Sequence, residues 1–227
     1  MRADTPRKRD AVLIVFARAP VPGKAKTRLA AAIGAEAAAR LHARLVERAV
    51  ATAVAARAGA VELHCAPDAR HPFFARLAAR YGVALRAQGR GEVGARMHRA
   101  LARALRGAAA AAVLVGCDCP VLRASDLRRA LRELRAGADA VFAPAEDGGY
   151  ALVGLRRSAP QLFSGIEWGS ARVMSATRER LRELGWSWRE LRQVWDVDRP
   201  EDYERLRRSR LLRSRPTGAA VRRCAPR

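Results

Sequence analysis

A short apolar run that ends in an acidic turn constrains this chain more than any other feature. Residues 113–115 are apolar, and the turn that follows them reads Gly-Cys-Asp-Cys-Pro at 116–120. The apolar residues predict a buried strand, and Pro120 ends it because proline has no backbone N–H to pair. Ligands of open α/β sheets bind at the carboxyl ends of the strands. The stretch therefore predicts that Asp118 lies at a binding edge.

Asp118 could act on a ligand or could cap the helix that follows. Ser125 directly precedes a helical pattern at 126–135 and is the better candidate for the N-cap. Asp118 then remains available for chemistry, and its carboxylate is a suitable oxygen ligand for a divalent cation that binds phosphate. We therefore interpret Asp118 as a functional residue rather than a turn residue.

Further apolar runs alternate with Ala-rich or amphipathic segments along the chain. Strands are expected at 11–17, 60–65, 83–87, 113–115, 138–144 and 151–155, and helices at 35–58, 73–81, 95–105, 126–135 and 171–184. This alternation is typical of an α/β fold with a mostly parallel sheet. We expect one domain at 11–206, with a disordered N-terminus at 1–10 and a disordered, Arg-rich tail at 207–227.

The net charge is strongly positive, but its distribution does not resemble a nucleic-acid-binding surface. It is +22, from 44 Lys and Arg against 22 Asp and Glu, and aromatic residues make up only 5% of the chain. The arginines are spread through Ala-rich segments, without the aromatic and basic repeats that stack bases. We do not expect a nucleic-acid partner, although a nucleotide- or nucleic-acid-binding protein without catalysis remains an alternative.

Two further classes of protein are disfavoured. No apolar segment reaches the length of a membrane span, and no signal peptide is evident, so we expect a cytoplasmic protein without a membrane partner. The four cysteines, at 65, 117, 119 and 224, lack the paired spacing of a zinc site. We interpret Cys117 and Cys119 as small apolar residues and do not expect a disulfide framework.

The first predicted strand leads into a loop with the properties of a phosphate-binding site. Glycine permits close approach of the backbone to a ligand, a helix start offers N–H donors, and cations supply charge. The spacing of a Walker A loop is absent. The residues that we assign to nucleotide or phosphate binding here are Pro22, Gly23, Lys24, Lys26 and Arg28.

A second loop, at 88–97, follows the third predicted strand and carries three glycines within six residues. Such a density of glycine indicates a backbone that passes close to another group. We expect this loop to approach the nucleotide, with Gln88, Gly94 and Arg96 as its binding residues.

The remaining candidates lie in the C-terminal half of the chain. The Asp-Gly pair at 147–148 is a hairpin signal between two apolar runs, yet its carboxylates could reach the same sheet edge as Asp118. Ser170 and Asp198 are expected to be helix N-caps, whereas Asp196 has no structural role. The residues that we assign to the substrate or acceptor are Glu146, Gly148, Gly149, Tyr150, Trp168, Ser170 and Asp196.

Together these motifs resemble the DUF2064 family of GT-A-like proteins, also described as nucleotide-diphospho-sugar transferases or glycosyltransferases, some of them associated with radical-SAM and arsenosugar gene clusters. The resemblance covers about residues 11–206. It is carried by six segments in order, at 16–29, 94–97, 116–120, 146–150, 168–170 and 196–202. The resemblance implies a three-layer, Rossmann-like nucleotide-diphospho-sugar transferase fold of the GT-A type.

The family resemblance also implies a DXD-like acid at the end of a central strand. This chain has one aspartate where a full DXD has two, so a second ligand must come from elsewhere, with Asp147 as the candidate. We expect Asp118 and Asp147 to be catalytic and to hold Mg²⁺ or Mn²⁺, with Asp147 alternatively the base that orients the acceptor.

The expected partners are a nucleotide or nucleotide-sugar and a small-molecule acceptor. The expected reaction is metal-dependent glycosyl transfer from a nucleotide-diphospho-sugar, in which the cation and the basic loop stabilise a phosphate leaving group. The alternative reaction is nucleotidyl transfer from an NTP to a phosphorylated substrate, with release of pyrophosphate.

Overall fold

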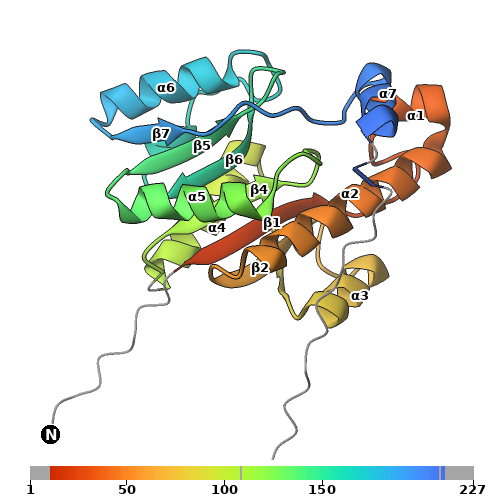
Figure 1. Ribbon diagram of the computed structural model, residues 1–227, viewed down its shortest axis with the longest axis horizontal. Coiled ribbons are helices and arrows are strands. Elements are labelled where there is room, and N and C mark those ends of the chain that lie inside the picture. The colour runs from red at the N-terminus through yellow and green to blue at the C-terminus, as the bar shows by residue number, and fades with distance from the viewer. Residues whose placement is uncertain (1–10, 108, 210, 213–227) are drawn as a thin grey trace, which may run out of the picture.

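The computed structural model describes residues 11–107, 109–209 and 211–212, which form a seven-stranded sheet between helices (Figure 1). The strand order is β3-β2-β1-β4-β6-β5-β7, and β6 is antiparallel to both of its neighbours while the other pairs are parallel. The strands are β1 (Val12–Arg18), β2 (Ala60–Ala66), β3 (Ala84–Ala87), β4 (Ala112–Gly116), β5 (Ala140–Pro144), β6 (Tyr150–Leu155) and β7 (Trp188–Glu190).

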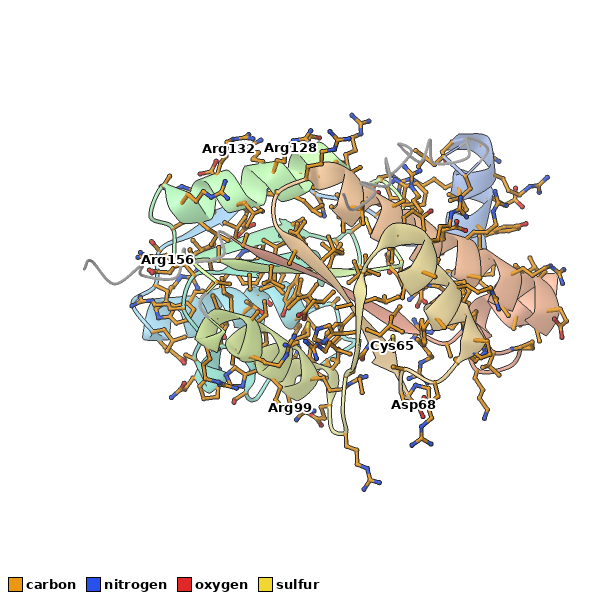
Figure 2. The ribbon with its side chains drawn as sticks, turned by 90° about the horizontal axis from the view of Figure 1, so that it is seen from below. Cys65, Asp68, Arg99, Arg128, Arg132 and Arg156 are labelled. Carbon is orange, nitrogen blue, oxygen red and sulfur yellow. The ribbon has the colours of Figure 1, made fainter. Side chains whose placement is uncertain are left out.

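The helices form the two outer layers. Helices α2, α3 and α5 pack on one face of the sheet, and α4 and α6 pack on the other. Figure 2 shows Arg128 and Arg132 of α5 on the opposite side of the sheet from Arg99 of α4. Helices α1 and α7 contact each other beside the first half of α2. The bounds are α1 (Thr27–Ile33), α2 (Ala35–Ala56), α3 (Pro72–Tyr81), α4 (Val93–Arg106), α5 (Ala124–Arg135), a 3-10 helix at Pro160–Phe163, α6 (Val173–Glu183) and α7 (Pro200–Ser209).

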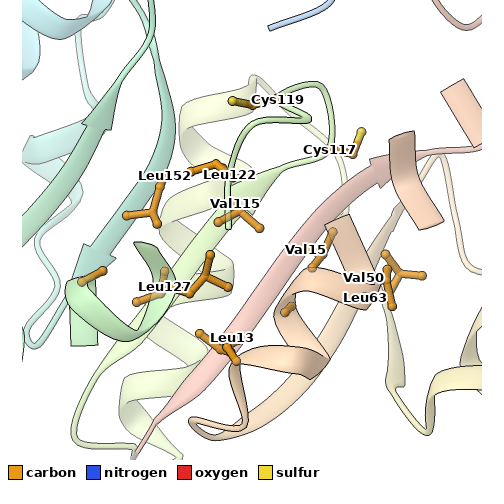
Figure 3. Packing of buried hydrophobic residues seen from close by; sticks show 14 of the residues in the cluster. Leu13, Val15, Val50, Leu63, Val115, Cys117, Cys119, Leu122, Leu127 and Leu152 are labelled. Atoms are coloured by element: carbon orange, nitrogen blue, oxygen red, sulfur yellow. The ribbon is translucent and has the colours of Figure 1, made fainter. Parts of the chain in front are cut away.

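Strand β1 shows why the sheet lies in the middle. Its residues from Val12 to Ala17 are all buried, and successive side chains point to opposite faces. Leu13 and Val15 pack with α2, α3 and α5 (Figure 3), whereas Ile14 and Phe16 pack with α4 and α6. Burial of each large side chain contributes about 1.5–3 kcal/mol, so a continuous apolar strand is stable only with both faces covered.

The strand order determines where a ligand can bind. The chain builds β2 and β3 on one side of β1 and then returns to place β4 on the other side. This reversal is a topological switch point, where a crevice opens beyond the carboxyl ends of the strands. The loops after β1 and β4 therefore lie next to each other, and the loops after β3, β5 and β7 reach the same edge.

The α/β class, the mostly parallel sheet and the expected strands are confirmed, and the Asp-Gly turn does join β5 to β6 as a hairpin. The segment at 27–33, expected to be loop at its start, is the separate helix α1. Helix α7 continues to Ser209, beyond the expected domain end at 206. Residues 1–10 and 213–227, which we expected to be disordered, lie outside the described residues.

The three expected N-caps are wrong. Helix α5 is capped at Arg123, whose N–H donates to the Asp126 carboxylate at 2.9 Å, rather than at Ser125. Helix α6 begins at Val173, after Ser170. At α7, Asp202 accepts the N–H groups of residues 198 and 199, which leaves the Asp198 side chain for other partners. At α5 and α7 another carboxylate therefore accepts the terminal N–H groups, and at α6 the turn before the helix is longer than expected.

None of the helices in the described part of the chain has the length and apolar character that crossing a bilayer requires.

Candidate functional site

Two adjoining pockets lie at the switch point, and Asp118 lines both of them. The first, which we call the cationic pocket, has a volume of about 560 Å³. Its charged lining residues are Arg18, Lys24, Lys26, Arg28, Arg96, Asp118 and Asp198. The second, which we call the acidic pocket, has a volume of about 250 Å³. Its polar and aromatic lining includes Phe16, Asp118, Asp147, Tyr150, Trp168, Ser170 and Asp196. The two pockets form one cleft with a charge boundary at Asp118.

The loop between β1 and α1, together with the first turn of α1, supplies three cations to the cationic pocket. Lys24 and Arg28 are exposed, whereas the Lys26 side chain is only 4% exposed. Lys26 has a left-handed backbone, with φ of 52°, at the residue before α1. A non-glycine residue in this region is uncommon and costs free energy. The fold therefore holds Lys26 in an unfavourable conformation that directs its ammonium inward.

The Lys26 ammonium contacts two carboxylates. Its Nζ lies 2.8 Å from Oδ1 of Asp118 and 3.5 Å from Oδ1 of Asp198. Burial favours the neutral amine, but the charge of Asp118 outweighs it and raises the pKa of Lys26. Burial likewise opposes ionisation of Asp118, yet Lys26 keeps the pKa of that carboxyl below its usual value. Both groups are therefore charged at neutral pH.

His42 of α2 approaches the same oxygen of Asp118. Its Nε2 donates to the carbonyl of Arg18 at 3.0 Å, so in the neutral ring Nδ1 carries only a lone pair. Burial lowers the pKa of His42 and favours that neutral form. Nδ1 lies 3.8 Å from Oδ1 of Asp118 and has no hydrogen-bond partner among the described residues. A buried nitrogen lone pair thus faces the carboxylate.

His42, Cys117 and Asp118 bring one potential metal-ligand atom each to within 4.8 Å of one another. Burial raises the pKa of the Cys117 thiol well above its usual value, so the sulfur stays protonated and is a poor ligand. Carboxylate oxygens with one imidazole nitrogen suit Mn²⁺ or Mg²⁺ better than a soft metal. The donor pair formed by Asp118 and the orphaned Nδ1 of His42 therefore fits a divalent cation, and Asp147 lines the same pocket as Asp118 without belonging to this cluster.

Gln88 connects the ends of three strands to the cationic pocket. Its side-chain amide donates to the carbonyls of Ala17 at 3.1 Å and His64 at 2.9 Å, and its Oε1 accepts from Arg96 at 2.6 Å. Gln88 is buried, which makes these bonds costly to lose. The residue orients Arg96 toward the pocket rather than projecting freely into it.

The acidic pocket contains a carboxylate with an altered pKa. Burial, together with the charge of Asp147, raises the pKa of Asp196 to about 6. Asp147 itself is exposed, and its Oδ1 accepts the N–H of Gly149 at 2.9 Å. A carboxylate with a pKa near neutral pH can remove a proton from a substrate efficiently. Asp196 is thus suited to act as a general base in this pocket.

Trp168 and Tyr150 form the aromatic wall of the acidic pocket, with their ring centroids 6.3 Å apart in an edge-to-face arrangement. Trp168 packs on Gly94 of α4 so closely that a Cβ atom at Gly94 would lie 2.4 Å from the indole ring. At Gly148, a Cβ atom would lie 2.1 Å from the carbonyl oxygen of Ala171. Two of the predicted glycines therefore support this wall by allowing close packing.

The structure brings most of the predicted residues together and moves a few elsewhere. Lys24, Lys26, Arg28, Gln88 and Arg96 line the cationic pocket, and Asp147, Gly149, Tyr150, Trp168, Ser170 and Asp196 line the acidic pocket. Pro22, Gly23, Gly94 and Gly148 line neither pocket. Glu146, also outside both pockets, pairs with Arg205 at 2.6 Å, and we therefore do not retain it among the acceptor residues.

Sequence reasoning missed three charged or titratable residues of the cleft: Arg18, His42 and Asp198. Arg18 is the last residue of β1, and its position in the strand–loop junction was a usable signal. His42 lies inside an Ala-rich helix, where nothing in the local pattern indicates a binding site. Asp198 had a sufficient local explanation as a helix cap, which hid its pairing with Lys26 and Arg28.

Comparisons with known proteins agree with this geometry. The family described as uncharacterized protein conserved in bacteria (DUF2064) matches residues 49–170. A crystal structure from Desulfovibrio desulfuricans G20, provisionally named a nucleotide-diphospho-sugar transferase, is 30% identical with a TM-score of 0.81, over 95% of this chain and 91% of that one. A search of curated proteins gives no match.

More distant structures share the fold alone. A CMP:2-keto-3-deoxy-manno-octonic acid synthetase in complex with CTP has a TM-score of 0.59 at 15% identity, over 90% of this chain and 100% of that one. The glucosyl-3-phosphoglycerate synthase of Mycobacterium tuberculosis, in complex with Mn²⁺ and UDP, has a TM-score of 0.51 at 11% identity, over 90% and 76%. The fold thus occurs in both nucleotidyl and glycosyl transferases.

Proposed function

Because the chain belongs to the DUF2064 family and has the fold of nucleotide-diphospho-sugar transferases, we propose that it transfers a glycosyl group from a nucleotide-diphospho-sugar to a small acceptor. One observation carries the choice of reaction. Among the residues that the structure describes, the acidic pocket is lined by three aspartates and by no Lys, Arg or His, in a chain with 44 Lys and Arg residues. Charge is therefore segregated within the cleft, and each side suits a different substrate.

The cationic pocket suits the diphosphate of the donor. Lys24, Arg28, Arg96 and Arg18 face this pocket together with Lys26. Cations held in a partly enclosed site stabilise the charge that builds on a departing nucleoside diphosphate, since water screens them less there than in bulk solution. These side chains would bind the donor and stabilise the leaving group in the same contacts.

The acidic pocket suits a neutral or cationic acceptor. In nucleotidyl transfer to a phosphorylated substrate, the attacking group is an anion, and among the described residues the acidic pocket offers no Lys, Arg or His to bind it. A glycosyl acceptor presents a hydroxyl or amine, and Asp196 would take its proton as the acceptor atom bonds to the sugar carbon and the bond to the diphosphate breaks. Trp168 and Tyr150 provide apolar surfaces for the sugar or acceptor.

A divalent cation would be held by Asp118, with Asp147 and Nδ1 of His42 as further donors. When bound, such a cation supplies charge neutralisation at the diphosphate oxygens. Asp196 is not one of these proposed metal donors, so it remains available as the general base. Mn²⁺ or Mg²⁺ matches the oxygen-rich donors.

Release of free nucleoside diphosphate from a nucleotide-sugar, with transfer of labelled sugar, tests the proposal. Nucleotide-sugars and nucleotides are first screened for thermal stabilisation with and without Mn²⁺, because a ligand of the native state raises its apparent stability. In the active pair, Asp196→Asn should lower turnover about 100-fold or more with little effect on donor binding. Glu146→Gln, which alters a carboxylate outside both pockets, is the matched control and should retain wild-type turnover.

Nucleotidyl transfer is the second candidate, and one observation favours it. Five cations line the cationic pocket, enough to bind a triphosphate as well as a diphosphate. Pyrophosphate released from an NTP in the presence of a sugar phosphate, without nucleoside diphosphate release from any nucleotide-sugar, would establish this reaction instead. Binding to DNA that weakens steeply with salt, with neither reaction detectable, would favour the non-catalytic alternative.

A further inference from the structure

The ammonium of Lys26 contacts the Asp118 oxygen that faces the other potential metal-ligand atoms of the cluster. Its Nζ contacts Oδ1 of Asp118 at 2.8 Å, the oxygen that also faces Nδ1 of His42 and the Cys117 thiol. A divalent cation on that oxygen would meet a buried ammonium at close range, and like charges at such a distance repel strongly where water is scarce. Lys26 and a metal ion therefore compete for Asp118.

Asp198 strengthens the hold on Lys26. It lies 3.5 Å from Nζ through Oδ1, while its Oδ2 accepts from Arg28 at 3.0 Å. The four side chains alternate in charge, in the order Asp118, Lys26, Asp198, Arg28. Each charge therefore has an opposite neighbour within this cluster.

A diphosphate would supply the ammonium with a new partner. Lys26 and Arg28 both line the cationic pocket, together with Lys24 and Arg96. Phosphate oxygens in this pocket compete with Asp118 and Asp198 for the same two cations. As Lys26 turns toward phosphate, Asp118 loses its counter-ion and becomes a better ligand for a metal.

We propose that Lys26 is a counter-ion that excludes a divalent cation from Asp118 until the donor diphosphate draws the ammonium away, so that donor and metal bind cooperatively. The inference rests on the proposed function for the identity of the diphosphate. Linkage requires reciprocity: if phosphate raises the affinity for metal, metal raises the affinity for phosphate by the same factor. Lys26 is on this account a positioning residue for the metal site as well as a phosphate ligand.

Mn²⁺ binding without any nucleotide tests the proposal directly. Free Mn²⁺ is counted by electron paramagnetic resonance during titration of the full chain. Lys26→Met removes the competing charge and should tighten Mn²⁺ binding about tenfold or more, within the usual range of site-to-site coupling. Arg76→Met removes an exposed cation of α3 that lines neither pocket and should leave the affinity near that of the wild type.

Adding Asp118→Asn to Lys26→Met locates the bound ion. The double variant should lose the gain in affinity, because the carboxylate that Lys26 protected is gone. Mn²⁺ binding by Lys26→Met that is equal to or weaker than wild type would overturn the proposal, and so would a gain that survives Asp118→Asn. Lys26→Gln is measured alongside, and circular dichroism melting verifies that each variant is folded.

The assay contains no donor or acceptor, so it does not depend on turnover. Tighter Mn²⁺ binding by Lys26→Met without any glycosyl transfer would support the counter-ion role and contradict the reaction. Glycosyl transfer by the wild type, with Mn²⁺ binding unchanged in Lys26→Met, would support the reaction and overturn the counter-ion role.

Discussion

Lys26 and Asp118 form an ion pair in which the two partners differ sharply in exposure: the lysine side chain is 4% exposed and the aspartate side chain is 44% exposed. The lysine thus depends on its partner for compensation of charge, whereas the aspartate can be hydrated from the cleft. Removal of one partner of a buried pair is costly because it leaves the other charge uncompensated.

We expect Asp118→Asn to destabilise the protein by about 3 kcal/mol, and Lys26→Met by about 1 kcal/mol or less, because only the first change leaves a buried charge without its main partner. Urea denaturation at neutral pH measures both free energies of unfolding. Equal losses in the two variants would show that Asp198 compensates Lys26 fully by itself.

The raised pKa of Asp196 predicts a pH-dependent gain in stability when its charge is removed. Burial and Asp147 raise this pKa from 3.8 to about 6. The fold therefore favours the protonated acid, and its stability falls as pH rises through that interval. Asp196→Asn should stabilise the protein by about 1–3 kcal/mol at pH 7.5 and by almost nothing at pH 4. Urea denaturation at both pH values measures this change in the free energy of unfolding. A destabilisation of equal size at pH 7.5 and pH 4 would contradict the raised pKa of Asp196.

Gly94 tests the support of the aromatic wall. Alanine usually stabilises a helix relative to glycine by about 1 kcal/mol. At Gly94 the new methyl group would overlap the Trp168 ring, so we expect Gly94→Ala to cost about 1–3 kcal/mol. It should also alter Trp168 fluorescence and raise KM for the acceptor. Gly107→Ala, after the end of the same helix with no contact below 3.4 Å, is the control and should be nearly neutral.

Gln88 is predicted to matter for both stability and phosphate binding. Gln88→Leu leaves the buried carbonyls of Ala17 and His64 without their side-chain donor and removes the acceptor that orients Arg96. We expect a loss of about 2–4 kcal/mol in stability and weaker binding of pyrophosphate, measured by calorimetry without metal. Gln193→Leu, at an exposed position, should change neither quantity.

The sequence predicted the elements better than their ends. The apolar runs that form β1 and β4 and the Ala-rich pattern of α2 depend on neighbours a few residues away, and these expectations held. Helix caps depend on which of several nearby polar side chains accepts the hydrogen bonds of the terminal N–H groups. At α5 and α7 the aspartates at 126 and 202 reach them, in preference to Ser125 and Asp198.

The amino-acid sequence by itself determined strands β1 to β6, most of the helices, the cationic loop after β1 and the acid at the end of β4, because each is encoded in one continuous stretch. Strand β7 and the separate helix α1 were not predicted. Only the tertiary structure decided that Asp118 would meet Lys26 and His42, and that Asp198 would join Lys26 and Arg28. Those contacts follow from the order of strands in the sheet, which brings separate loops to one edge. Electrostatic interactions depend on distance in space and on burial, and neither can be read from separation along a chain.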